Sequence, residues 1–363
     1  MCLPKNIVLL INTLKSGGAE KQCALLAKHL STEFNVLIIV YYGNQVDQKI
    51  TSIYEKSNVR VLFLNGAHLK RIILLYQYFR NNSNSVFISY LFTTNLLNAL
   101  IGWVTGTRVR IGGIRSARLP SFKRIIQRIL HNLFLDYTIV NSSKGLEYCT
   151  EHGFDAKKLK LITNAIEIKQ APKKNYEDYR IINEFKIITV ARFVPSKDFK
   201  TALTAVKYVL ESKELSGIPI HYYIVGYGEL EQQIRAWIKE FSLSAFVSII
   251  INPQNVGDYL SNANVYLSSS IFEGTSNSIL EAMEYSLPFV ATDAGDTKEL
   301  VIENVNGIIM NVGDSLGLSG ALEKIILNQE LRYLYGTNSY EVLRKKYSID
   351  NFISNYKSIL INA

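Results

Sequence analysis

The sequence has few cysteines, and from its first residues we expect no secretory leader. Its three cysteines, Cys2, Cys23 and Cys149, are odd in number, and their spacing fits neither a disulfide framework nor a metal site. The first apolar run, residues 7–11, is too short for a signal peptide and has no small-residue cleavage site. These features predict a reducing, cytoplasmic location.

Charged residues are missing between Asn81 and Thr107, a stretch long enough to raise the question of a membrane span. Four polar residues interrupt the apolar run near its middle: Thr93, Thr94, Asn95 and Asn98. We therefore expect a buried strand at residues 86–90, followed by a buried helix at about 94–104.

Acidic residues are missing from a longer interval. Residues 56–135 contain twelve Lys and Arg but no Asp or Glu, while the whole chain has a formal net charge of +9. A one-sided field of this kind attracts polyanions such as nucleic acid, anionic lipid headgroups or a diphosphate. A solvated basic face without a partner is the alternative. Because no recognised nucleic-acid-binding module is visible, we expect no nucleic-acid partner.

Within this interval, residues 121–134 have the spacing of an amphipathic helix. Apolar residues recur three and four positions apart (Phe122, Ile125, Ile126, Ile129 and Leu133), and the cations Lys123, Arg124 and Arg128 fall mainly on another side. The apolar stripe could pack on the domain core or lie in a membrane interface. In both cases the cations stay outside, so we predict salt-reversible, peripheral binding to an anionic membrane, at the inner face of the plasma membrane.

A chain of 363 residues is long enough for two domains, and strand and helix patterns alternate twice along it. A polar segment without a clear period, residues 169–184, separates the two alternations. The patterns predict two Rossmann-like α/β domains, at 1–168 and 185–346, each built on a parallel sheet. Because ligands bind at the carboxyl ends of parallel strands, we expect the two domains to face each other across a ligand cleft.

Two pairs of glycines lie where a predicted strand gives way to a helix. They are Gly17 with Gly18, and Gly226 with Gly228. Glycine lets backbone amides approach a phosphate or a sugar at the positive end of a helix. A tight turn without function is an equal alternative at each pair.

Two cations, Arg192 and Lys197, follow the first predicted strand of the second domain. Cations at the mouth of a strand can hold both phosphates of a nucleoside diphosphate, Arg through its planar fork and Lys as a point charge. A pair of surface cations without function is the alternative.

The strongest pattern is the segment from Ser268 to Met283, a strand, a loop and a helix. It places Glu273 in the loop and Glu281 about one turn inside the helix, with Ser276 or Asn277 as the helix cap. A phosphate can lie at the amides between the two glutamates, and each carboxylate can hold hydroxyl groups on its own side. Those amides belong to Gly274, Thr275, Ser276 and Asn277.

At these residues the sequence resembles the family 4 glycosyltransferases, which are retaining enzymes of the GT-B fold. The resemblance covers nearly the whole chain and includes the Ser-Gly-Gly-Ala-Glu turn, the Arg192 and Lys197 pair, the second glycine turn and the two glutamates eight residues apart. Residues 347–363 look like the closing helix that in such enzymes packs toward the first domain.

The resemblance implies a uridine diphosphate sugar as donor and a lipid-linked saccharide as acceptor. Arg192 and Lys197 would bind the donor diphosphate and stabilise the leaving group, Glu281 would hold the ribose, and Glu273 would hold the transferred sugar. It implies no cofactor and no metal, and the sequence contains no Asp-x-Asp pair of metal ligands.

Two positions depart from the family pattern. Arg115 stands where many relatives have a histidine, and we take Arg115 and Arg118 as candidate contacts of a lipid diphosphate acceptor. The usual Asn-Gly-(Val or Ile)-Asp reads Asn164-Ala165-Ile166-Glu167, which loses the glycine. A nucleotide-sugar epimerase, which also uses two facing Rossmann-like domains, is the alternative enzyme.

Overall fold

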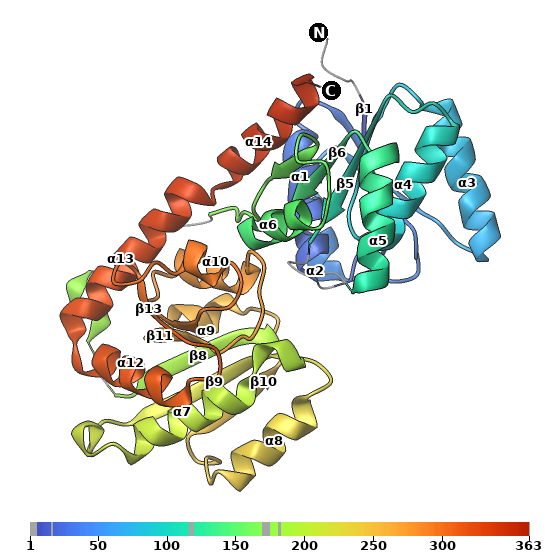
Figure 1. The fold of residues 1–363 in the computed structure, drawn as a ribbon. Coiled ribbons are helices and arrows are strands. Elements are labelled where there is room, and N and C mark those ends of the chain that lie inside the picture. Colours follow the sequence, from blue (N-terminus) through green and yellow to red (C-terminus); the bar gives the residue numbers. More distant parts are fainter. Residues whose placement is uncertain (1–5, 16, 116–119, 169–174, 181–182, 363) are drawn as a thin grey trace. The chain divides into compact units, whose positions relative to one another are not determined.

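The computed structural model describes residues 6–15, 17–115, 120–168, 175–180 and 183–362 (Figure 1). The chain divides into two compact units. Unit 1 comprises Met1–Glu167 together with Ile349–Ala363, and unit 2 comprises Ile168–Ser348. Both units are α/β, which confirms the expected fold class.

Unit 1 contains a seven-stranded parallel sheet in the order β3-β2-β1-β4-β5-β6-β7. The strands are β1 (Asn6–Ile11), β2 (Asn35–Val40), β3 (Val59–Phe63), β4 (Val86–Ser89), β5 (Val109–Ile114), β6 (Tyr137–Val140) and β7 (Leu159–Leu161). Side chains of β1 alternate between two cores: Ile7, Leu9 and Ile11 enter one, and Val8 and Leu10 enter the other. The sheet is therefore buried on both faces, as parallel sheets usually are.

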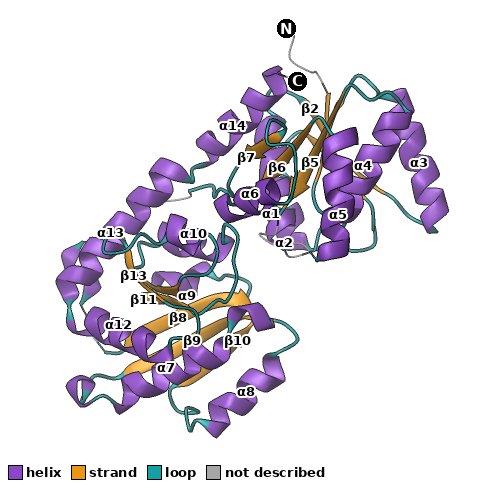
Figure 2. Ribbon diagram, viewed as in Figure 1, coloured by secondary structure: helices purple, strands orange, loops and turns teal. Residues whose placement is uncertain are grey.

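Helices cover both faces of this sheet (Figure 2). They are α1 (Gly18–Leu30), α2 (Gln48–Thr51), α3 (His68–Asn81), α4 (Phe92–Val104), α5 (Ser121–Ile129), the π-helix η1 (Leu130–Phe134), α6 (Ser143–Glu151) and α14 (Ile349–Asn362). One core takes residues from α1 and α14, and the other takes residues from α3 and α4.

The uncharged stretch forms β4 and α4, as predicted. Its polar residues bind the backbone of β5: Asn95 both donates to Gly113 (2.9 Å) and accepts from it (3.0 Å), and Asn98 donates to the carbonyl oxygen of Ile111 (3.1 Å). Within the described part of the chain, no helix combines the length and apolar character that crossing a bilayer requires.

The amphipathic segment forms α5 and continues into η1, but of its apolar stripe only Ile126 packs on a core cluster. Phe122 and Leu133 are 74% and 69% exposed, and Ile125 and Ile129 are exposed as well. The buried side of α5 instead includes Gln127, whose Oε1 accepts a 3.1 Å hydrogen bond from Asn95. Since buried Asn95 needs this acceptor, Gln127 faces inward, and the other four residues of the apolar stripe face solvent.

Unit 2 contains a six-stranded parallel sheet in the order β10-β9-β8-β11-β12-β13. The strands are β8 (Phe185–Arg192), β9 (Ile220–Tyr227), β10 (Val247–Ile251), β11 (Val265–Ser268), β12 (Phe289–Thr292) and β13 (Gly307–Met310). The helices are α7 (Phe199–Glu211), α8 (Glu231–Glu240), α9 (Gly257–Ser261), α10 (Asn277–Glu284), α11 (Thr297–Leu300), α12 (Ser315–Leu327) and α13 (Gln329–Lys346), with short 3-10 helices η2 (Tyr176–Tyr179), η3 (Pro195–Lys197) and η4 (Lys213–Leu215).

The segment expected to link the domains, 169–184, lies partly outside the described residues, which omit 169–174 and 181–182. Its described part includes η2. The chain returns to unit 1 at α14, which supplies five residues to the unit 1 core: Phe352, Ile353, Tyr356, Ile359 and Leu360.

Candidate active site

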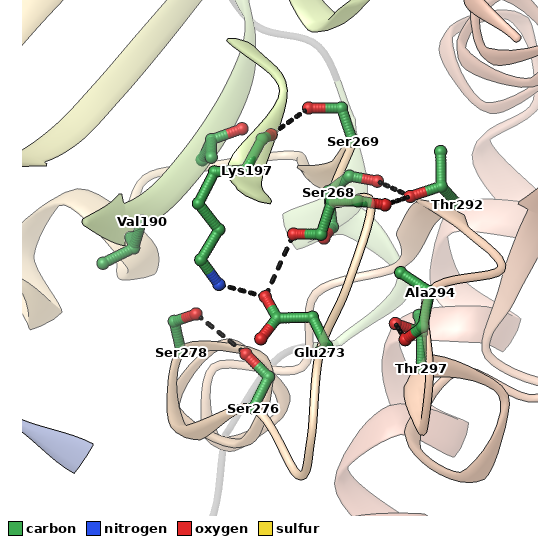
Figure 3. Close-up of polar contacts among 12 residues, drawn as sticks. Val190, Lys197, Ser268, Ser269, Glu273, Ser276, Ser278, Thr292, Ala294 and Thr297 are labelled. Carbon is green, nitrogen blue, oxygen red and sulfur yellow. Dashed lines mark hydrogen bonds and ion pairs between the residues drawn. The ribbon is translucent and has the colours of Figure 1, made fainter. Parts of the chain in front are cut away.

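The carboxyl ends of β8 and β11, which are paired in the unit 2 sheet, bring the strongest sequence motifs together. Lys197 in η3 follows β8, and Glu273 lies in the loop after β11. The ammonium group of Lys197 forms an ion pair with Oε1 of Glu273 (Figure 3). Both side chains are mostly buried, with 14% and 12% of their surfaces exposed. The cation and the acid predicted for the donor site are therefore in direct contact.

Backbone contacts fix the loop after β11 against η3. The hydroxyl of Ser269 donates to the carbonyl oxygens of Lys197 (2.8 Å) and Asp198 (2.9 Å). The amide of Ile271 donates to the carbonyl oxygen of Ser196 (2.8 Å). These contacts hold the backbone that carries Lys197 beside the loop that carries Glu273.

The backbone of Glu273 is also held from the β12 side. Gly295 has a φ of +59°, and a Cβ there would overlap the carbonyl oxygen of Glu273. The amide of Asp296 donates to that same oxygen (3.4 Å). Only a glycine at position 295 permits this approach, so the segment after β12 sets the position of the acidic loop.

Arg192 ends β8 beside the second glycine turn. Gly226 and Gly228 have φ values of +152° and +154°, and a Cβ at Gly228 would lie 2.6 Å from the carbonyl oxygen of Phe193. Without side chains, the end of β9 can pack closely on the end of β8. The guanidinium of Arg192 is exposed and forms no ion pair with any residue that the structure describes.

The helix α10 begins where the sequence predicted. Ser276 is its N-cap residue, Asn277 its first residue, and Glu281 lies one turn further along, half-buried. Thr275 and Ser276 are buried before the helix start, and Gly274 and Asn277 are half-buried. The amides at this helix start therefore lie at the positive end of α10, where a phosphate can bind, and between the two glutamates in the sequence.

Tyr266 of β11 is buried near Glu273 and Glu281. Its hydroxyl donates to the carbonyl oxygen of Val190 (2.8 Å). Burial raises the pKa of Tyr266, and the charges of Glu273 and Glu281 raise it further. Its hydroxyl therefore stays protonated at neutral pH and keeps β11 hydrogen-bonded to β8.

The unit that contains this site matches a known protein family. The model of the glycosyl transferases group 1 matches residues 173–342, which span almost all of unit 2. The chain thus matches the group 1 glycosyl transferases over just under half of its length, in unit 2.

Two relatives from Campylobacter jejuni match nearly the whole chain. One is named N-acetylgalactosamine-N,N'-diacetylbacillosaminyl-diphospho-undecaprenol 4-alpha-N-acetylgalactosaminyltransferase; it is 26% identical over 351 residues, covering 90% of this chain and 92% of the relative. The other, a GalNAc-alpha-(1->4)-GalNAc-alpha-(1->3)-diNAcBac-PP-undecaprenol alpha-1,4-N-acetyl-D-galactosaminyltransferase, is 23% identical over 333 residues and 89% of each chain.

Solved structures share the fold. Anabaena HepE in complex with UDP superposes with a TM-score of 0.84 at 17% identity, over 99% of this chain and 100% of that one. The galactosyltransferase WaaB gives a TM-score of 0.76 at 16% identity, over 98% and 99%. These likenesses confirm the α/β two-domain fold of the GT-B type for this glycosyltransferase.

The first glycine pair of the glycosyltransferase belongs to unit 1. Gly17 is the N-cap residue of α1 and Gly18 its first residue. The carboxylate of Glu20 lies against Gly17 and accepts a 3.1 Å hydrogen bond from Thr13. An acidic side chain thus already lies at the positive end of α1. The remaining predicted donor residues all belong to unit 2.

Arg115 follows β5, and its guanidinium contacts other residues of unit 1. Its guanidinium donates to the hydroxyl of Tyr356 (2.9 Å) and to Oδ1 of Asn164 (3.4 Å), and lies 4.7 Å from the centre of the Tyr90 ring. The other candidate for the acceptor, Arg118, lies outside the described residues.

Sequence reasoning missed the small residues that brace the site of the glycosyltransferase. Ser269, Ser270, Thr292 and Gly295 fix the loops that carry Lys197 and Glu273. The run of three serines before the acidic loop was a visible signal, but the partners of their hydroxyls depend on strand pairing. Among the described residues, no group of three His, Cys, Asp or Glu side chains could hold a metal ion.

Proposed function

We propose that the enzyme transfers a sugar from a uridine diphosphate sugar to a hydroxyl of a lipid-linked saccharide, with retention of anomeric configuration and without a metal. The observation that carries this proposal is the contact of Lys197 with Glu273 at the carboxyl edge of the unit 2 sheet. A cation for the leaving diphosphate and an acceptor for sugar hydroxyls lie side by side, as the two halves of a nucleotide sugar require.

The leaving diphosphate accumulates negative charge as the glycosidic bond breaks, and positioned cations stabilise that charge. Arg192 offers a planar fork and Lys197 a point charge. Arg192 is exposed at the strand end, where a diphosphate can reach it. These two side chains supply the positive charge that a metal would otherwise contribute, so we expect activity to survive EDTA.

On this proposal, the two glutamates hold different parts of the donor. Glu273 accepts hydrogen bonds from the transferred sugar, Glu281 accepts them from the ribose, and the amides at the start of α10 face the phosphates. Glu273→Ala should then lose transfer while still binding free UDP, and Glu281→Ala should weaken the binding of UDP itself. Normal binding and normal transfer in both variants would show that these residues have only a structural role.

Three observations support the choice of substrates. The HepE structure superposes on this chain and contains UDP. Both Campylobacter relatives are named for undecaprenol-linked saccharides and for alpha products. Common UDP-sugars are alpha glycosides, so an alpha product means retention. UDP-N-acetylgalactosamine is accordingly the first donor to test.

The donor is tested by thermal shift with UDP and with UDP-N-acetylgalactosamine, UDP-N-acetylglucosamine, UDP-galactose and UDP-glucose. A ligand that binds only the folded state raises the melting temperature. Lys197→Ala should lose this shift, and Lys200→Ala, which removes an exposed cation three residues away, should keep it. Conversion of a donor to its epimer without an acceptor would overturn the transferase proposal in favour of an epimerase.

The membrane part of the proposal rests on unit 1. The exposed stripe of α5 and η1 is continued by Trp103 at the end of α4, which is 59% exposed and packs edge-on against Phe134 (5.5 Å). Lys123 and Arg128 on α5 are exposed. Exposed apolar side chains beside cations, on elements that contact one another, match an anionic membrane interface.

Co-sedimentation with liposomes containing anionic lipid tests this part, at low and high salt. The variant with Lys123, Arg124 and Arg128 changed to Glu should bind at least 100-fold more weakly, because each cation near the surface contributes about 1 kcal/mol. Changing three exposed lysines of unit 2 to Glu, at positions 213, 239 and 324, controls for net charge. If wild type stays in the supernatant at low salt, the membrane part is wrong.

A further inference from the structure

The carboxylate of Glu273 uses its two oxygens unequally. Oε1 receives both the ammonium group of Lys197 and a 3.0 Å hydrogen bond from the hydroxyl of Ser270. Within the described part of the chain, no hydrogen bond reaches Oε2. One oxygen is therefore occupied by the protein, and the other remains available to a ligand.

Ser270 is itself fixed in place. It is 2% exposed, and its carbonyl oxygen accepts a 2.6 Å hydrogen bond from the hydroxyl of Thr292 at the end of β12. The next residue back, Ser269, is bonded to the backbone of η3 (Figure 3). The Ser270 hydroxyl therefore approaches Glu273 from a rigid position between two strand ends.

We propose that Ser270 is a positioning residue that holds Oε1 of Glu273 against Lys197 and leaves Oε2 to accept a hydrogen bond from a hydroxyl of the donor sugar. This inference rests on the proposed transfer from a UDP-sugar. Ser270 touches neither nucleotide nor sugar, and it acts by fixing the rotation of the carboxylate.

The physical reason lies in the competition for the carboxylate. An ammonium group attracts both oxygens of a carboxylate equally, so Lys197 alone does not choose between them. A second donor on Oε1 fixes that choice. Without it, Glu273 can turn so that Oε2 also faces Lys197, and the sugar hydroxyl loses its acceptor. A charge-assisted hydrogen bond of this kind changes rates by roughly 10- to 100-fold.

The test compares Ser270→Ala with Ser270→Thr, which keeps the hydroxyl. The control is Ser319→Ala, which removes another buried hydroxyl of unit 2, one bonded to the carbonyl oxygen of Leu316 (2.9 Å). Three properties are measured: the melting temperature, the affinity for free UDP, and turnover of UDP-N-acetylgalactosamine by transfer or by hydrolysis. We expect Ser270→Ala to bind UDP within about twofold of wild type, to turn over roughly 10- to 100-fold more slowly, and to be rescued by threonine.

Donors that lack one sugar hydroxyl sharpen the test. Removing the hydroxyl bound by Oε2 should slow wild type strongly and Ser270→Ala much less, because that variant has already lost the contact. Equal losses in both enzymes, or turnover of Ser270→Ala within twofold of wild type, would overturn the inference. So would a matching loss of UDP affinity and melting temperature without rescue by threonine, which indicates a purely structural role. If wild type itself neither binds UDP nor turns over any UDP-sugar, the proposed function fails instead.

Discussion

The guanidinium of Arg115 donates a 2.9 Å hydrogen bond to the hydroxyl of Tyr356, although 241 residues separate them in the sequence. Arg115 follows the internal strand β5, and Tyr356 lies in α14, with its side chain fully buried in the unit 1 core. The contact ties the last helix of the chain to the carboxyl edge of the unit 1 sheet. Arg115 thus has a structural partner, and its predicted role toward the acceptor remains a prediction.

Tyr356→Phe should destabilise unit 1. The change leaves the half-buried guanidinium of Arg115 without one of its acceptors, which costs about 1.5–3 kcal/mol. Heat unfolding together with hydrogen exchange of the α14 amides measures the effect. Tyr333→Phe, which removes the hydroxyl of an exposed tyrosine in α13, is the control and should leave both unchanged. Unaltered exchange in α14 of Tyr356→Phe would contradict this account.

Arg192→Ala should slow turnover about 100-fold or more, corresponding to about 3 kcal/mol, by analogy with the loss of a donor to a developing oxyanion. The melting temperature should not change, because Arg192 is exposed and makes no ion pair among the described residues. Steady-state rates with the best donor measure this. A near-normal rate would remove Arg192 from the site.

Gly226→Ala should destabilise unit 2 by about 1–3 kcal/mol and lower the affinity for UDP. The new Cβ would overlap the carbonyl oxygen of Ala191, the residue before Arg192, and would displace the end of β8. Gly217→Ala is a matched control: its φ is also positive, at +86°, but nothing lies within 4 Å of the added Cβ. If both variants lose stability equally and keep UDP affinity, close packing beside Arg192 is not the role of Gly226.

The free energy of unfolding should fall at acid pH, in part because His131 is protonated more readily in the unfolded chain than in the folded one. Its ring is buried, with Nδ1 2.8 Å from the Thr138 hydroxyl and Nε2 3.0 Å from the carbonyl oxygen of Asp155, and burial lowers its pKa. The unfolded chain then binds this proton more readily than the folded chain. The stabilising contribution is complete above the unfolded value of about 6.5 and is lost as the pH falls below it.

Urea unfolding between pH 5 and 8 measures this dependence. His29, whose pKa is also lowered by burial, adds to the same slope. His131→Gln should therefore flatten the slope in part, and His68→Gln, at an exposed position in α3, serves as control. An unchanged slope in His131→Gln would show that this histidine does not carry the effect.

The sequence predicted the strands with continuous apolar runs closely, because burial on both faces leaves a strong pattern. The strand expected at residues 86–90 is β4 (Val86–Ser89), and α10 begins directly after the predicted cap residue Ser276. β5 was harder to recognise, since it contains Gly112 and Gly113, which weaken a strand pattern. They occur there because a Cβ at either one would lie 2.7 Å from a neighbouring atom, Leu135 Cδ1 or the Ser89 carbonyl oxygen.

The part of the candidate site that depends only on which residues follow each strand could be predicted from the sequence. Lys197 and Glu273 each follow a strand, and parallel strands place their carboxyl ends together. The bracing by Ser270 and Thr292 was not predictable, because it depends on which strands are neighbours: β12 lies beside β11 in the sheet. The solvent exposure of the apolar side chains of α5 could not be predicted from the sequence either, because it follows from a hydrogen bond between Asn95 and Gln127.

The place of α14 in the core of unit 1 has a consequence for biosynthesis. Every strand of unit 1 has been translated before residue 168, yet five of its core side chains arrive only with α14. Translating residues 168–348 takes roughly 10 to 40 s at typical rates. During that interval unit 2 can complete its fold, whereas unit 1 exposes an apolar surface on the ribosome. Unit 1 is thus the part of the nascent chain most open to chaperones, and also to proteases.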